Sequence, residues 1–129
     1  MTYVPAKCGT LFIPSNIKDD KHLFFILNDA CKQGCHLLVN VTSIYEGVHF
    51  DPACVVEVGE HPFIKHKSYM NYRLADVHVS ARLTKMVGLR YFTPGDAASE
   101  ELVEKILKGA EASDYIPKRI LKYLKSIGR

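Results

Sequence analysis

The sequence contains no tryptophan and no long apolar run. Its longest uninterrupted apolar run, Leu23–Leu27, has five residues, whereas a helix that spans a bilayer needs about 20. We therefore expect no membrane partner. The first residues, Met1–Pro5, lack the charged and apolar regions of a secretory signal. The sequence thus predicts a cytoplasmic protein whose four cysteines are reduced thiols.

Motifs that hold common cofactors are also missing. The chain has no phosphate-binding loop of the Walker type, no dinucleotide fingerprint, no nucleophile elbow and no acidic cluster with divalent-metal spacing. Cys31-x-x-x-Cys35-His36, together with Cys8 and Cys54, offers ligands that zinc accepts, but no Cys-x-x-Cys knuckle is present. The alternative is that Cys8 and Cys54 are small apolar strand residues and that Cys31 and Cys35 flank a turn. We expect no metal and no cofactor.

Length and composition indicate one globular domain, residues 1–129. A chain of 129 residues has the usual size of a single domain and can bury a core without disulfides or metals. Its 47% apolar and 24% charged residues are ordinary for a globular protein. The net charge of +3 is compatible with a nucleic-acid partner but does not require one.

Short β-strands dominate the first two thirds of the chain. Val39, Val41 and Thr42 are β-branched residues of the kind enriched in strands, and the six-residue run 22–27 resembles a strand covered on both faces. For Ser68–Leu83 both a strand and a helix fit the spacing, and we favour a strand. The expected strands are residues 9–14, 22–27, 36–43, 53–58 and part of 68–83, and together they predict a β core over residues 8–92, a small barrel or half-open roll.

The last third is predicted to be a helical pair, residues 98–128. Ser99 has the character of an N-cap and is followed by acidic residues in the first turn. A second amphipathic helix is expected to begin near Ser113 or Asp114, with Pro117 in its first turn, where a missing N–H is tolerated.

Two segments contain residues suited to chemistry on a phosphodiester. The run His61–Tyr69, with Tyr72 and Arg73 downstream, combines histidines that can transfer protons, cations that hold phosphates and tyrosines that stack on unpaired bases. The alternative is an exposed loop whose basic residues are solvated. The segment Asn40–Ser43 places hydroxyls at a strand end, where they can face a cleft or simply form a turn.

The order of these pieces resembles the MazF/PemK-type growth-inhibitor toxins over roughly residues 9–83. A strand that opens with Gly9 is followed by a polar loop that leads into the apolar strand Lys21–Leu27. The next strand ends in the pair Thr42-Ser43, and a strand that begins at Ser68 leads to Arg82-Leu83. The resemblance implies an SH3-like barrel, in which Arg82 and Leu83 form the closing strand, followed here by two C-terminal helices.

The resemblance also implies a function, which is metal-independent cleavage of single-stranded RNA by a toxin-like endoribonuclease. Thr42 corresponds to the family's threonine, whereas His22 stands at the position of the family's arginine. Unlike arginine, histidine can lose its proton near neutral pH. The catalytic residues are then His22 and Thr42, and the substrate-binding residues are Lys21, Ser43, His66 and Arg73. A protein antitoxin and a homodimer are the implied partners besides RNA.

The missing arginine and the added helices favour a second interpretation. In it the chain is a non-catalytic SH3-like binding module that recognises a protein partner or a nucleic acid.

Overall fold

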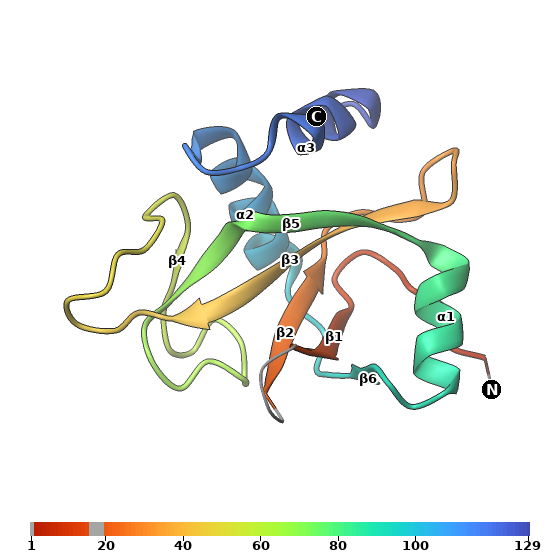
Figure 1. Cartoon of the computed structure of the whole chain (residues 1–129), viewed down its shortest axis with the longest axis horizontal. Helices are drawn as coiled ribbons and strands as arrows, with labels where there is room; N and C mark the ends of the chain where they lie inside the picture. The colour runs from red at the N-terminus through yellow and green to blue at the C-terminus, as the bar shows by residue number, and fades with distance from the viewer. Residues whose placement is uncertain (1, 16–19) are drawn as a thin grey trace.

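The computed structural model describes residues 2–15 and 20–129, which form one six-stranded antiparallel sheet and three helices (Figure 1). The strands are β1 (Thr10–Pro14), β2 (Lys21–Ile26), β3 (Cys35–Ser43), β4 (Val55–Val56), β5 (Ser68–Val79) and β6 (Thr93–Pro94). The helices are α1 (Ser80–Gly88), α2 (Glu100–Ala112) and α3 (Lys118–Ser126). The expected class, β with α, is confirmed.

The sheet is open. Its strand order is β4-β5-β3-β2-β1-β6, and β4 and β6 form the two edges. Each edge strand has two residues, and within the described residues β4 pairs only with β5 and β6 only with β1. The strand pairing therefore does not close the barrel that the sequence predicts.

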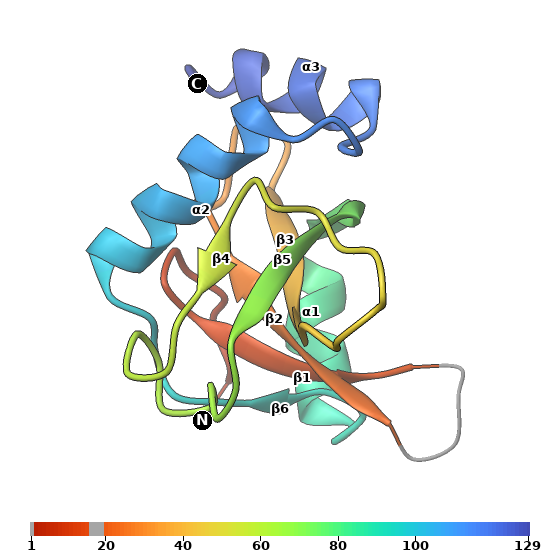
Figure 2. The same cartoon turned by 90° about the vertical axis from the view of Figure 1, so that its left-hand side faces the viewer.

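Both faces of the sheet carry a hydrophobic layer. Alternate residues such as Leu23 and Phe25 join a large core with the buried faces of α2 and α3. Residues of the opposite parity, such as Ile26 and Leu38, pack with Leu83 of α1 in a second, smaller core. Figures 1 and 2 show the corresponding layers, with α2 and α3 on one side of the sheet and α1 away from them. This double coverage confirms the prediction, made from residues 22–27, of a strand covered on both faces.

The ambiguous segment 68–83 changes from strand to helix at Ser80. Ser68, Met70 and Tyr72 are buried while Tyr69 and Asn71 are less so, which is the alternation of a strand with one buried face. The expectation of a strand is correct through Val79 and wrong beyond it. Arg82 and Leu83, expected in the closing strand of the barrel, lie in α1 instead, because Leu83 is fully buried under the sheet.

The remaining elements differ from expectation mainly in their ends. The predicted strand 53–58 is reduced to Val55–Val56 at the sheet edge. Ser99 is the N-cap of α2, as predicted, and its hydroxyl accepts the Leu102 N–H at 3.0 Å. Pro117 is the N-cap of α3 rather than a first-turn residue, so this helix begins later than predicted. Within the described residues, no helix has the length and apolar character needed to cross a membrane.

Candidate functional site

A hollow of about 450 Å³ lies where β2 begins and β3 ends. Five of the six residues that the sequence analysis assigns to catalysis or substrate binding line it, namely Lys21, His22, Thr42, Ser43 and His66. The other lining residues are Asp20, Leu23, Val41, Tyr45, Phe63, Ile64, Lys65 and Ser68.

The pairing of β2 with β3 places His22 beside Thr42. The two strands are antiparallel, and Leu23 is opposite Val41. His22 precedes Leu23 and Thr42 follows Val41, so the two residues lie just beyond the last pair of this ladder, and both line the hollow. The row continues on both sides, since Ile13 is opposite His22 and Tyr69 is opposite Thr42.

Lys21 and Ser43 lie one residue farther along, at the strand ends. Because side chains alternate along a strand, these two belong to the opposite face from His22 and Thr42. Ser43 is paired with Ser68, the first residue of β5. Lys21 and Ser43 line the hollow together with His22 and Thr42 because the hollow surrounds the strand ends.

His66 and Lys65 are presented by a loop that His61 anchors. His61 is 3% exposed, and its Nδ1 accepts the Phe63 N–H at 3.1 Å while Nε2 lies 2.8 Å from the Asp96 carbonyl oxygen. A ring nitrogen that accepts leaves the other to donate, so Nε2 carries the proton. Ile64 is buried in the core. His61, one of the candidate residues in the sequence run, therefore has a structural role.

Two aromatic side chains that the sequence analysis did not assign to the site also line the hollow. Tyr45 is 65% exposed and Phe63 is 42% exposed. The Phe63 ring also meets the Phe12 ring edge to face, with centroids 5.4 Å apart. Exposed aromatic faces are the surfaces on which unpaired bases stack. The sequence does not predict that Tyr45 and Phe63 join His22 and Thr42, because these two aromatic residues reach the hollow from separate loops.

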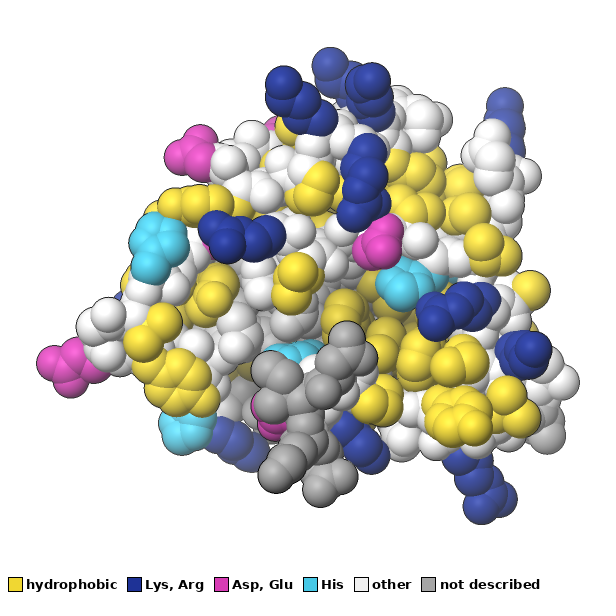
Figure 3. All heavy atoms as spheres, in the orientation of Figure 1, with side chains coloured by type: hydrophobic (Ala, Val, Ile, Leu, Met, Phe, Trp, Pro, Cys, Tyr) yellow, Lys and Arg dark blue, Asp and Glu magenta, His cyan; other side chains and the backbone are white. Residues whose placement is uncertain are grey.

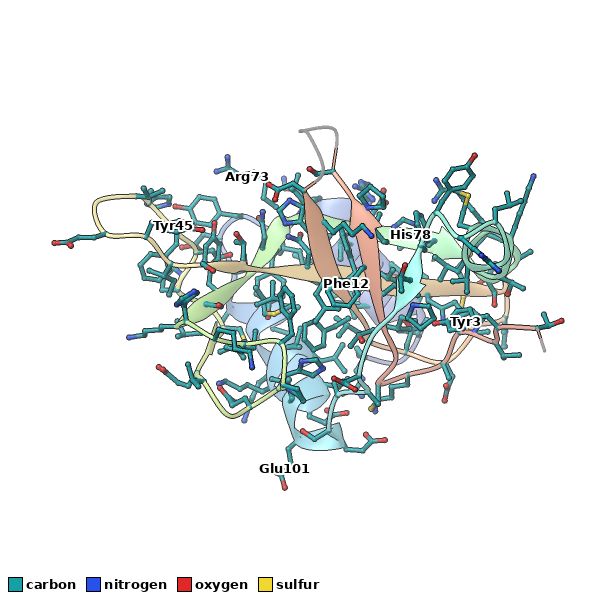
Figure 4. All side chains as sticks on the ribbon, turned by 90° about the horizontal axis from the view of Figure 1, so that it is seen from below. Tyr3, Phe12, Tyr45, Arg73, His78 and Glu101 are labelled. Atoms are coloured by element: carbon teal, nitrogen blue, oxygen red, sulfur yellow. The ribbon has the colours of Figure 1, made fainter. Side chains whose placement is uncertain are left out.

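Arg73 is the predicted site residue that the first hollow does not include. It lines a smaller hollow of about 140 Å³, and its guanidinium lies 5.3 Å from the centre of the Tyr115 ring. The Tyr115 hydroxyl is 2.7 Å from His49 Nε2. Tyr69, the cross-strand neighbour of Thr42, lines this second hollow too. Figure 4 shows Arg73 and Tyr45 in one half of the molecule, with Tyr3 and His78 in the other.

The charges around the first hollow are mostly positive. Lys21 and Lys65 line it, and Asp20 is the acidic residue among its described lining. Asp and Glu side chains are sparse on the face shown in Figure 3, where Lys, Arg and His side chains lie among apolar ones. Within residues 2–15 and 20–129, no group of three or more His, Cys, Asp or Glu residues has a geometry suited to a metal ion.

The arrangement can hold a phosphate and transfer a proton. An imidazole can accept or donate a proton, a threonine hydroxyl can donate to a charged oxygen, and lysines neutralise phosphate charge. No protein-family profile matches the chain, and no curated protein matches it.

Proposed function

We propose that this protein binds single-stranded RNA in the hollow at the ends of β2 and β3 and cleaves it there without a metal ion. The observation that carries the proposal is that His22 and Thr42 lie just beyond the last β2–β3 pair and line one hollow together with Lys21, Lys65 and His66. The resemblance to MazF/PemK-type toxins, stated from the sequence, points to the same two residues.

In the proposed reaction the RNA itself supplies the nucleophile. His22 removes the proton of a ribose 2′-hydroxyl, and the 2′-oxygen attacks the adjacent phosphorus. The bond from phosphorus to the 5′-oxygen breaks, the leaving oxygen takes a proton from water, and a 2′,3′-cyclic phosphate remains. Thr42 donates a hydrogen bond to a non-bridging oxygen, where negative charge builds up. Lys21, Lys65 and His66 hold neighbouring phosphates, and Ser43 adds a hydroxyl at the strand end.

Exposed aromatic side chains supply the preference for unpaired RNA. Tyr45 and Phe63 each offer a ring face to a base in the first hollow. The second hollow holds a flanking nucleotide, with Arg73 toward the phosphate and Tyr69 toward the base. Tyr69 connects the two because it lies opposite Thr42 and lines the second hollow.

We also propose that the fold is an SH3-like barrel. A barrel of this kind that is open between β4 and β6 is compatible with the observed strand order. A protein antitoxin and a homodimer remain predictions of the resemblance.

A cleavage assay in EDTA tests the proposal. Purified protein is incubated with a long single-stranded RNA, and the ends of the products are identified. We expect 2′,3′-cyclic phosphate and 5′-hydroxyl ends, with rates reduced at least about 100-fold by His22→Ala. Thr42→Ala should lower the rate and Thr42→Ser should restore most of it. Lys122→Gln on α3, outside both hollows, is the control. Intact RNA, or cleavage that the His22 and Thr42 variants leave unchanged, would contradict the proposal.

The exposure of Tyr45 and Phe63 also favours the second candidate function, a non-catalytic module that binds RNA or a protein through the same hollow. This function predicts saturable binding that Tyr45→Ala and Phe63→Ala weaken, without any cleavage. The cleavage and binding assays together therefore separate the two functions.

A further inference from the structure

A third cavity, of about 890 Å³, lies far from the proposed RNA site in the fold, between the turn that joins β2 to β3 and the C-terminal helix α3. Cys31 and Cys35 line it from the turn, and Tyr123 lines it from α3. Both cysteines are half-buried and carry free thiols. The proposed cleavage reaction makes no use of them.

The turn holds the two cysteines close together. The Cys31 N–H donates to the Cys35 carbonyl at 3.1 Å, and the Gly34 N–H donates to the Cys31 carbonyl at 2.8 Å. Gly34 has φ 72°, so a tight turn followed by a left-handed residue brings the chain back on itself. One backbone hydrogen bond thus joins Cys31 to Cys35 across the turn, and disulfides span Cα atoms about 4.4–6.8 Å apart.

The two sulfur atoms also converge on one residue. Cys31 Sγ lies 3.5 Å from Gln33 Oε1, and Cys35 Sγ lies 3.7 Å from the Gln33 carbonyl oxygen. A side-chain hydrogen bond joins the two thiols, and both cysteines line the cavity, so a small oxidant can reach both.

From this geometry we infer that Cys31 and Cys35 form a dithiol that a hydroperoxide oxidises to a disulfide across the turn. The Cys31 sulfur attacks one oxygen of hydrogen peroxide. The S–O bond forms, the O–O bond breaks, and the leaving hydroxide takes a proton to become water. The Cys35 sulfur then attacks the Cys31 sulfur, the S–O bond breaks, and a second water leaves. Two thiols and one peroxide give one disulfide and two waters.

The surroundings decide which thiol reacts first. A hydrogen bond from Tyr123 lowers the pKa of the Cys31 thiol. Burial raises the pKa of Cys35, and it likewise raises the pKa of Cys8 and Cys54. The thiolate is the nucleophile, so Cys31 is the sulfur that attacks and Cys35 the one that resolves. The charged groups that line the cavity are Lys7, Asp29, Lys32 and Arg129.

The oxidised turn would retain its contacts with two helices. The Tyr123 hydroxyl donates to the Cys35 carbonyl oxygen at 3.1 Å, and the Ser80 N–H at the start of α1 donates to the Gly34 carbonyl at 2.8 Å. Tyr123 has one hydroxyl proton and two acceptors, the Cys35 carbonyl and the Cys31 sulfur. Disulfide formation removes the Cys31 thiol as an acceptor, and the Tyr123 hydroxyl then donates to the Cys35 carbonyl oxygen alone.

The test is treatment of the purified protein with hydrogen peroxide, followed by intact mass measurement and peptide mapping. The wild type should lose about 2 Da and yield a peptide with Cys31 joined to Cys35. Cys35→Ser should instead gain about 16 Da at Cys31 and be trapped by dimedone as a sulfenic acid. Cys31→Ser should react at least about tenfold more slowly.

The matched control is Cys8→Ser, which should still form the disulfide at the wild-type rate. Circular dichroism of each variant verifies that it is folded, and each sulfur-to-oxygen change keeps the side chain's shape. A disulfide that involves Cys8 or Cys54 would overturn the inference. So would a wild type that accumulates stable +16 Da or +32 Da products at Cys31, or one that does not react. RNA cleavage by the reduced protein is unaffected by any of these outcomes.

Discussion

The Tyr72 hydroxyl donates a hydrogen bond of 2.6 Å to the Ile106 carbonyl oxygen. The bond joins the middle of β5 to the middle of α2, 34 residues away, and Tyr72 is fully buried. Burial raises the pKa of Tyr72, so the phenol stays protonated and acts as the donor. It thus fixes the position of α2 on the sheet.

We predict that Tyr72→Phe lowers the free energy of unfolding by about 1 kcal/mol, because it removes this hydrogen bond and keeps the ring. Urea denaturation monitored by circular dichroism measures the change. Tyr91→Phe, at a residue that is 60% exposed, is the control and should have little effect. Equal stability of the Tyr72 variant and the wild type would mean that this hydrogen bond contributes nothing to the free energy of unfolding.

Gly109 is required at the same contact. A Cβ added there would collide with the Tyr72 hydroxyl and with Cys54 Cβ. Gly109→Ala should therefore destabilise the protein by about 1–3 kcal/mol, although alanine is the better helix former. Gly88→Ala in α1, where a Cβ would meet nothing within 4 Å, should be neutral or stabilising by up to about 1 kcal/mol. Thermal melts of both variants measure the difference, and equal effects would contradict the packing argument.

Glu104 makes stability depend on pH. Hydrogen bonds from Arg129 and Lys7 lower the pKa of its carboxyl from 4.5 to about 2. A lowered pKa in the folded state gives stability that is present above about 4.5 and is lost as the pH falls toward about 2. The side chain is 48% exposed, so solvent screening limits the contribution to below about 1 kcal/mol.

We expect Glu104→Gln to flatten the decline in unfolding free energy over this pH range, measured by urea titrations at each pH. Glu101→Gln changes a carboxylate on the same helix that makes none of these contacts, and it should keep the wild-type slope. A Glu104 variant with the wild-type slope would show that the ion pairs do not hold in solution.

Lysines of the first hollow should set the salt dependence of RNA binding. Lys65 lines the hollow and is exposed. Each phosphate contact adds about 0.7 to the slope of log affinity against log salt for a single strand. Lys65→Gln should therefore lower the slope by about 0.7, as measured by fluorescence anisotropy with a labelled oligonucleotide. Lys122→Gln should lower it much less, and an equal reduction would indicate non-specific attraction.

The sequence predicts those elements whose pattern has only one interpretation. The continuous apolar run 23–27 is too short for a helix and therefore predicts a strand. Ser99, followed by acidic residues, fits only the start of a helix. The spacing of residues 68–83 fits both the repeat of a strand and that of a helix. Tertiary packing decides where the helix begins, because Leu83 is buried against Leu11, Ile26 and Leu38 of the sheet. The shortening of 53–58 to a two-residue strand follows from its place at the sheet edge.

The candidate site likewise contains residues that the sequence predicts and contacts that it does not. The resemblance points to His22 and Thr42, and the structure places both residues in the lining of the first hollow. The separation of Arg73 into a second hollow depends on where Tyr115 meets it, 42 residues away in the chain, and no local pattern encodes that contact. The structural role of His61 rests on a hydrogen bond to a carbonyl 35 residues away.

The two-residue edges have a consequence for association. An exposed strand edge is a template for strand addition by another chain, and its strength grows with the number of unpaired backbone groups. Here β4 offers two residues and β6 offers two, of which Pro94 has no N–H to donate. A dimer or a bound peptide that extended the sheet at β4 or β6 would gain few hydrogen bonds. Strand addition at these two edge strands is therefore a weak mode of association for this protein.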